Sequence, residues 1–173
     1  MTGYPSFSSD GKWIYFTSDR TGEFQIWKMP VSGGDASQLT HNGGLRAIEA
    51  PDGAFVYYTQ TMDTPSALWR VPSSGGAPVK VLGGVVLGAF AVVQGGIYYI
   101  HGPSGEGAVG YIDQPSGETR LQYLDLATGR STEVARNLGK VGAFLSASRD
   151  GRTILFTRMD SSLDELMLVE NFR

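Results

Sequence analysis

A repeated turn, together with the strands around it, constrains this fold most. Asp10-Gly11 recurs as Asp52-Gly53, as Gln94-Gly95 and as Asp150-Gly151. The first two steps are 42 residues each (52 − 10 and 94 − 52), and the third is 56 (150 − 94). Asp-Gly between two apolar runs is a strong hairpin signal, because a type I′ turn needs positive φ at both central residues. We therefore expect four copies of one hairpin-based unit.

Two further strands recur after each copy of this turn. The strand after each turn is rich in aromatic and β-branched residues, at Trp13–Thr17, Phe55–Thr59, Ile97–Ile100 and Thr153–Thr157. A second apolar strand follows in every copy, at Ile26–Pro30, Leu68–Pro72, Leu121–Asp125 and Leu166–Val169. Short strands that repeat with a period of about 40–45 residues are typical of β-propeller blades.

The repeat predicts an all-β fold, a β-propeller of four blades. Each blade is a four-stranded antiparallel meander, except that the last lacks its outer strand. In the first blade the innermost strand is expected at Tyr4–Ser8 and the outermost at Ala36–Thr40. The blades are expected at residues 3–40, 45–82, 88–135 and 141–170 of a single domain.

Composition argues against several function classes. The net charge is −3, which gives no electrostatic basis for binding nucleic acid or an anionic membrane. The sequence has no cysteine, so it can form neither disulfides nor thiolate metal sites. It contains no run of 18 apolar residues and does not begin with a signal peptide, and the compartment stays undecided from the residues alone.

The motif at Pro5–Arg20 reads Pro-x-Phe-Ser-x-Asp-Gly-Lys-x-Ile-x-Phe-Thr-Ser-Asp-Arg. It is followed by Ile26-Trp27 and by Leu-Thr-His-Asn-Gly-Gly at Leu39–Gly44. These residues resemble the WD40-like repeat of TolB-type β-propellers. The resemblance covers nearly the whole chain; it is strongest in the first two repeats and weakest in the third. Residues Leu166–Arg173 resemble the C-terminus of large bacterial proteins that join such a propeller to a winged-helix regulator or a kinase domain.

The resemblance implies a non-enzymatic scaffold for protein or ligand binding. It also implies that the chain is the C-terminal part of a larger TolB-like or regulator propeller. A bacterial, periplasmic or other extracytoplasmic location follows from the resemblance as well. The alternative is the propeller portion of a hydrolase or lyase whose catalytic residues lie elsewhere, because propellers serve many unrelated functions.

The sequence offers few catalytic or cofactor-binding patterns. Asp10, Asp52 and Asp150 are interpreted as turn residues with local hydrogen bonds, in preference to a ring of carboxylates around a channel. Three tryptophans at or near repeat positions are interpreted as core packing in preference to a binding face; they are Trp13, Trp27 and Trp69. The two histidines are sixty residues apart and predict no metal site (101 − 41).

One glycine-rich motif matches a dinucleotide fingerprint. Gly105–Gly110 reads Gly-x-Gly-x-x-Gly, but no helix is expected after it and no βαβ unit surrounds it. We interpret it as a loop and predict that the chain needs no cofactor.

The third repeat carries an inserted loop at His101–Glu118, the one non-repetitive feature. Its candidate partner-binding residues are His101, Tyr111, Asp113 and Gln114, because functional residues often lie in loops on a rigid scaffold. The alternative is a tolerated surface insertion. The partner is expected to be a protein or a small ligand, and a homodimer would supply 4 + 4 = 8 blades to one ring.

Overall fold

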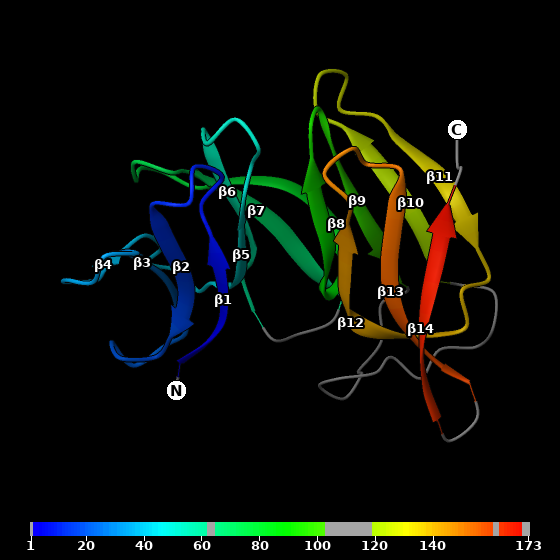
Figure 1. Ribbon diagram of the computed structural model, residues 1–173, viewed down its shortest axis with the longest axis horizontal. Coiled ribbons are helices and arrows are strands. Elements are labelled where there is room, and N and C mark those ends of the chain that lie inside the picture. Colours follow the sequence, from blue (N-terminus) through cyan, green and yellow to red (C-terminus); the bar gives the residue numbers. More distant parts are fainter. Residues whose placement is uncertain (1, 62–64, 103–118, 161–162, 171–173) are drawn as a thin grey trace. The chain divides into compact units, whose positions relative to one another are not determined.

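The computed structural model describes residues 2–61, 65–102, 119–160 and 163–170 (Figure 1). Every regular element in these ranges is a β-strand, as the repeat predicts. The described residues therefore include no helix that could cross a membrane. The chain divides into two compact units, Met1–Met62 with Ala67–Gly83 and Asp63–Ser66 with Gly84–Arg173.

The first unit contains two antiparallel meanders, drawn from blue to green in Figure 1. Its strands are β1 (Thr2–Phe7), β2 (Trp13–Ser18), β3 (Gln25–Pro30), β4 (Ser37–Gln38), β5 (Leu45–Glu49), β6 (Phe55–Thr59), β7 (Ser66–Pro72) and the start of β8 (Val79–Val93). Strands β1-β2-β3-β4 form one sheet, and β5-β6-β7-β8 are the first strands of a seven-stranded sheet that continues through β8 to β11. Strands that are neighbours in the sequence are therefore neighbours in the sheets.

The second unit repeats this organisation. It holds the rest of β8, β9 (Gly96–His101), β10 (Arg120–Asp125), β11 (Ser131–Arg136), β12 (Lys140–Ala147), β13 (Thr153–Asp160) and β14 (Leu163–Glu170). Strands β8 to β11 lie in sequence order, and β12-β13-β14 form a sheet of three among the described strands.

Each unit has its own buried core cluster. In the first unit the buried cluster is Tyr15, Ile26, Leu39, Ala47, Val56, Tyr58 and Val71. In the second it is Val86, Ala89, Ala91, Ile100, Leu121, Leu138, Val141, Leu145, Ile154 and Phe156. Strands β2 and β6 are buried along most of their length, which is why they read as almost continuous apolar and aromatic runs.

The turn after β1 differs from the expected two-residue type I′ hairpin. Only Gly11 has positive φ, at 71°, and the loop between Ser8 and Trp13 holds four residues. The Gly11 N–H donates to the Ser8 carbonyl (3.0 Å), and the Ser8 N–H donates to the Trp13 carbonyl (2.8 Å). Side chains close the loop, because Ser8 Oγ accepts the Trp13 N–H (2.8 Å) and donates to Asp10 Oδ1 (2.7 Å).

The same loop recurs after β12. Ser148 Oγ donates to Asp150 Oδ1 and accepts the Thr153 N–H (3.0 Å), and the Gly151 N–H donates to the Ser148 carbonyl (2.9 Å). After β5 the backbone bonds are kept, but Ala50 stands where the other loops have serine. The turn aspartates therefore accept hydrogen bonds within their own loops, as they were interpreted from the sequence.

Replacing Ser8 with alanine is expected to raise the pKa of Asp10. Hydrogen bonds from the Ser8 hydroxyl and the Lys12 N–H hold that pKa at about 2. A lowered folded-state pKa stabilises the fold above the unfolded value near about 3.9, and the stabilisation is lost as pH falls through about 2. Ser8→Ala should therefore move acid destabilisation to higher pH. Carboxyl NMR titration measures the shift; Ser9→Ala is the control, and an unchanged Asp10 pKa in Ser8→Ala would contradict the assignment.

One expected strand is shorter in the structure, and one continues where a connection was expected. The outer strand expected at Ala36–Thr40 is only β4, because the N–H groups of Leu39 and Thr40 both approach the Ile26 carbonyl (2.8 and 3.4 Å) and the ladder ends. Between the second and third expected blades, β8 runs through residues 82 to 88, and the two compact units divide within this stretch, between Gly83 and Gly84. Gly84 and Gly88 take positive φ there (78° and 67°), so glycine accommodates bends that would interrupt the strand with other residues.

Candidate functional site: the bulged inner strands

The first strand of each repeat carries a β-bulge at one repeat position. Pairing shifts register between Gly3 and Ser6 in β1 and between Leu45 and Ile48 in β5. Strands β8 and β12 shift register in the same part of the repeat. Bulges redirect side chains and are common next to active sites, so this position is the candidate functional site.

Two bulge residues have a backbone conformation that side chains disfavour. Tyr4 has φ 51° and Arg46 has φ 45°, and each stands six residues before its turn aspartate (10 − 4 and 52 − 46). Gly88 holds the same place before Gln94 in the third repeat, with φ 67° (94 − 88). A non-glycine residue in this region costs on the order of 1–3 kcal/mol and persists only where the surroundings hold it.

The Arg46 side chain is partly buried. Burial lowers its pKa to about 10, and a nearby Tyr4 phenolate would act in the opposite direction. Arg46 therefore stays cationic at neutral pH. Its backbone N–H donates to Thr17 Oγ1 of β2 (3.2 Å), so the neighbouring strand fixes the bulge. The site can present a positively charged planar group, which suits a carboxylate or a phosphate.

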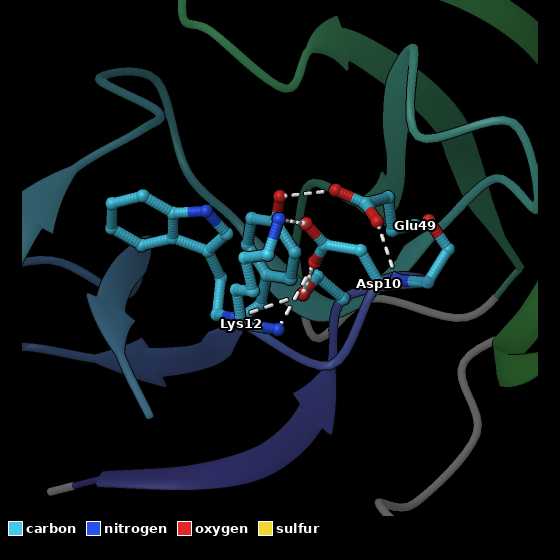
Figure 2. A network of polar contacts seen from close by, with 7 residues as sticks. Asp10, Lys12 and Glu49 are labelled. Carbon is cyan, nitrogen blue, oxygen red and sulfur yellow. Dashed lines mark hydrogen bonds and ion pairs between the residues drawn. The ribbon is translucent and has the colours of Figure 1, made fainter. Parts of the chain in front are cut away.

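The bulged strand β5 is also tied to the first sheet through Glu49, as Figure 2 shows. Glu49 Oε2 accepts the Ser9 N–H (2.6 Å), and Oε1 accepts the Tyr15 hydroxyl (2.5 Å). Burial, and then the Glu49 carboxylate, raise the pKa of Tyr15 far above its usual range. The Tyr15 hydroxyl therefore stays protonated and donates its hydrogen bond to Glu49. This network holds β5 in place and does not transfer protons.

The tryptophans behave largely as the sequence predicts. Trp27 is buried, and Trp69 packs against the core of the first unit. Trp13 is half-buried, with Lys28 Nζ 4.2 Å from its ring centroid. Within the described residues, the buried indole N–H groups of Trp27 and Trp69 have no hydrogen-bond partner. Core packing is confirmed for Trp27 and Trp69.

The loop residues singled out in the sequence are mostly outside the described part of the chain. Tyr111, Asp113, Gln114 and the glycine-rich motif at residues 105–110 all lie there. His101 is described, and it ends β9 opposite Arg120 of β10. Its imidazole lies against Gly84, where an added Cβ would be 2.4 Å from Cε1. His101 therefore has a packing role in β9, and partner binding by this loop stays a prediction.

Sequence reasoning missed Tyr4 and Arg46. Their spacing could have indicated them, because the two residues are 42 positions apart (46 − 4), which is the length of one repeat. Gly88 stands at the equivalent position of the third repeat. Among the described residues, no group of three or more histidines, aspartates or glutamates could hold a metal ion.

Comparisons with known proteins identify the fold of the chain. No protein-family model matches the sequence. An uncharacterized protein of Agrobacterium fabrum is 50% identical over 36 residues, which are 21% of this chain and 12% of that protein. A protein of Agrobacterium tumefaciens described as TolB superposes with a TM-score of 0.73 at 18% identity, over 98% of this chain and 58% of that one.

TolB of Acinetobacter baumannii gives a TM-score of 0.72 at 20% identity, over 97% of this chain and 40% of its own. Enzymes share the fold too, since oligogalacturonate lyase gives 0.67 at 18% identity, over 96% of this chain and 50% of its own. The chain thus spans about half the length of these proteins. Its fold is the β-propeller fold of TolB-type proteins, which propeller-bearing lyases share.

Proposed function

We propose that the chain is a non-enzymatic β-propeller scaffold, part of a larger TolB-like or regulator propeller, that binds a carboxylate-bearing partner through its bulged inner strands. The observation that carries this is the left-handed backbone of Tyr4 and Arg46 at one repeat position. We place the protein in a bacterial, extracytoplasmic compartment by its likeness to TolB.

Backbone strain supports a binding role at this position. Gly88 shows that glycine, which tolerates positive φ, can serve there. Tyr4 and Arg46 instead keep large side chains at a cost in stability, as residues at binding sites commonly do. Inner strands of propeller blades border the central channel, where ligands can reach them.

The chemistry of the side chains suggests the kind of ligand. Arg46 offers the fork of N–H donors that matches a carboxylate, and Tyr4 adds a phenolic hydroxyl at the same repeat position. Charged hydrogen bonds of this type contribute about 1.5–3 kcal/mol each, so Arg46 should account for tenfold or more of the affinity.

The competing function is the propeller portion of a hydrolase or lyase. Likeness to oligogalacturonate lyase favours this reading, because a galacturonate chain is also rich in carboxylates. The two readings differ in turnover. A scaffold binds without bond cleavage, whereas a lyase releases an unsaturated sugar.

The test uses two acidic probes, a hexaglutamate peptide and trigalacturonate. Calorimetry with the peptide should show binding to the wild-type chain and at least a tenfold loss in Arg46→Gly, with folding retained because glycine relieves the strain. Arg70→Ala is the matched control, since the Arg70 guanidinium lies over the Phe55 ring, 4.5 Å from its centroid, and its loss removes the same charge. Equal losses in both variants would refute a role for Arg46.

Trigalacturonate separates the scaffold from the lyase. Ultraviolet absorbance reports the unsaturated product, and none is expected from this chain. Turnover that a single substitution abolishes would overturn the scaffold proposal in favour of the lyase.

A further inference from the structure

The bulge of β5 takes the backbone around Arg46 out of the regular ladder. At the register shift, Arg46 and Ala47 both fall opposite one residue of β6. A bulge of this kind leaves backbone N–H and C=O groups without a ladder partner. Leu45 and Ala47, on either side of Arg46, are buried, so these groups need partners within the protein. The bulge therefore depends on hydrogen bonds from outside the ladder.

Two threonine hydroxyls hold the peptide group that joins Leu45 to Arg46. Thr59 Oγ1 of β6 donates to the Leu45 carbonyl (3.2 Å), and Thr17 Oγ1 of β2 accepts the Arg46 N–H (3.2 Å). This carbonyl and this N–H belong to one planar peptide group, so a side chain is bonded to each of its ends. Both threonines are buried. The orientation of the peptide plane just before Arg46 is therefore fixed.

A third hydroxyl holds the chain on the other side of Arg46. Ser6 Oγ of β1 donates to the Ala47 carbonyl (2.7 Å). To leave its φ of 45°, Arg46 would have to turn the backbone on one side or the other and so disturb at least one of the three hydrogen bonds. The hydroxyls thus oppose the relaxation that a strained residue would otherwise undergo.

The repeats show where such a threonine occurs. Thr59 and Arg46 belong to the second repeat, and their equivalents in the third are His101 and Gly88 (101 − 59 and 88 − 46, both 42). Gly88 adopts a φ of 67° without strain, because it has no side chain. The first repeat, whose bulge residue does carry a side chain, has Thr17 at this position. Threonine therefore accompanies the strained bulge residues and is replaced where glycine removes the strain.

Binding of a carboxylate by arginine depends on direction, because two N–H groups of the guanidinium must meet two oxygens. Groups at a binding site need to be held within about 0.5 Å of their productive geometry. We propose that Thr17 and Thr59 are positioning residues, which hold the Leu45–Arg46 peptide and so orient Arg46 toward the carboxylate. The inference rests on the proposed function, in which Arg46 binds that group. The threonines act through Arg46 and need no contact with the ligand.

The affinity for the hexaglutamate peptide is the first test. Thr17→Val replaces the hydroxyl with a methyl group of similar size, and it should weaken binding about fivefold or more, the factor that corresponds to one hydrogen bond. Thr17→Ser keeps the hydroxyl and should restore most of the affinity. In an Arg46→Gly background, Thr17→Val should cause no further loss, because the residue that it positions is gone.

Thr40→Val is the matched control. Thr40 is buried, and its Oγ1 accepts the Ile26 N–H (2.9 Å), so the variant removes the same kind of hydrogen bond away from the bulge. If Thr17 only stabilised the fold, the two valine variants would lose stability and still bind the peptide alike. Equal affinities would therefore overturn the proposal. Thr59→Val takes the place of Thr17→Val if the latter does not fold.

Hydrogen exchange of the Arg46 N–H, followed by NMR without ligand, separates this inference from the proposed function. Exchange should be about fivefold faster or more in Thr17→Val than in Thr40→Val, because only the first variant removes the acceptor of this N–H. If the wild-type chain does not bind hexaglutamate, the proposed function fails. Equal exchange of the Arg46 N–H in the two variants would instead refute the positioning by Thr17, whatever the peptide does.

Discussion

Gly43→Ala is expected to destabilise the first unit by about 2–5 kcal/mol. Gly43 has φ +89°, a conformation that costs an L-residue roughly 1–2 kcal/mol. A Cβ there would also lie 2.5 Å from the Gln60 carbonyl oxygen, a backbone atom. Overpacking of this kind costs about 1–3 kcal/mol more.

The clash cannot relax cheaply, because the loop is held on both sides. The Gly43 N–H donates to Gln25 Oε1 (3.1 Å), and the Gln60 side chain donates to the Asn42 carbonyl (2.6 Å). The buried Thr40 hydroxyl donates to the same Gln25 oxygen (2.9 Å). A shift of the loop would therefore weaken several hydrogen bonds at once.

Gly33→Ala is the matched control for this prediction. Gly33 also has φ +89°, but an added Cβ would meet nothing within 4 Å. Chemical denaturation of the two variants should show a cost of about 1–2 kcal/mol for Gly33→Ala and a clearly larger one for Gly43→Ala. Equal costs would mean that the φ angle alone accounts for the effect and that the loop yields to the new methyl group.

The repeat made the fold predictable from the sequence. A turn glycine, an aromatic strand and an apolar strand recur in step, and together they place the strands that follow each turn to within three residues. The registers bear this out, since Phe16 pairs with Trp27 in the first repeat and Tyr58 pairs with Trp69 in the second, 42 residues later. Because the pattern occurs in four copies, a misinterpreted residue in one copy does not change the predicted fold.

The turn geometry differs from the two-residue hairpin even where no hydroxyl is present. Ser8 Oγ and Ser148 Oγ accept the N–H of Trp13 and Thr153, yet the loop at Ala50 has the same backbone hydrogen bonds without a serine. The Asp-Gly pair alone therefore does not show how many residues the loop holds. Nor does the sequence show that β8 continues as one strand through Gly84 and Gly88.

The candidate site was hidden for a related reason. Arg46 and Tyr4 differ in chemistry, so neither appears as a repeated motif; what they share is a backbone angle. His101, which was chosen for its chemistry, lies at the end of β9 against Gly84. In this repeat protein, the shared backbone conformation becomes visible only when equivalent positions of the repeats are compared.

Phe90→Ala is expected to lower the free energy of unfolding of the second unit by about 3–5 kcal/mol. Phe90 lies in β8 opposite Tyr99 of β9, and its side chain has no exposed surface. Removing the ring takes away its burial energy and leaves a cavity that surrounding strands, held in their ladders, fill only partly. The cost should appear in urea denaturation as a lower midpoint with little change in slope.

Phe7→Ala removes the same atoms from the exposed end of β1 and is the matched control. This substitution should cost less than about 0.5 kcal/mol, as surface substitutions usually do. Benzene should bind the Phe90→Ala variant and recover part of its stability, because an apolar cavity of this size stays dry and accepts small aromatic molecules. A cost below about 1 kcal/mol, or no effect of benzene, would mean that β8 collapses into the space and that the second unit is packed less rigidly around Phe90 than its burial indicates.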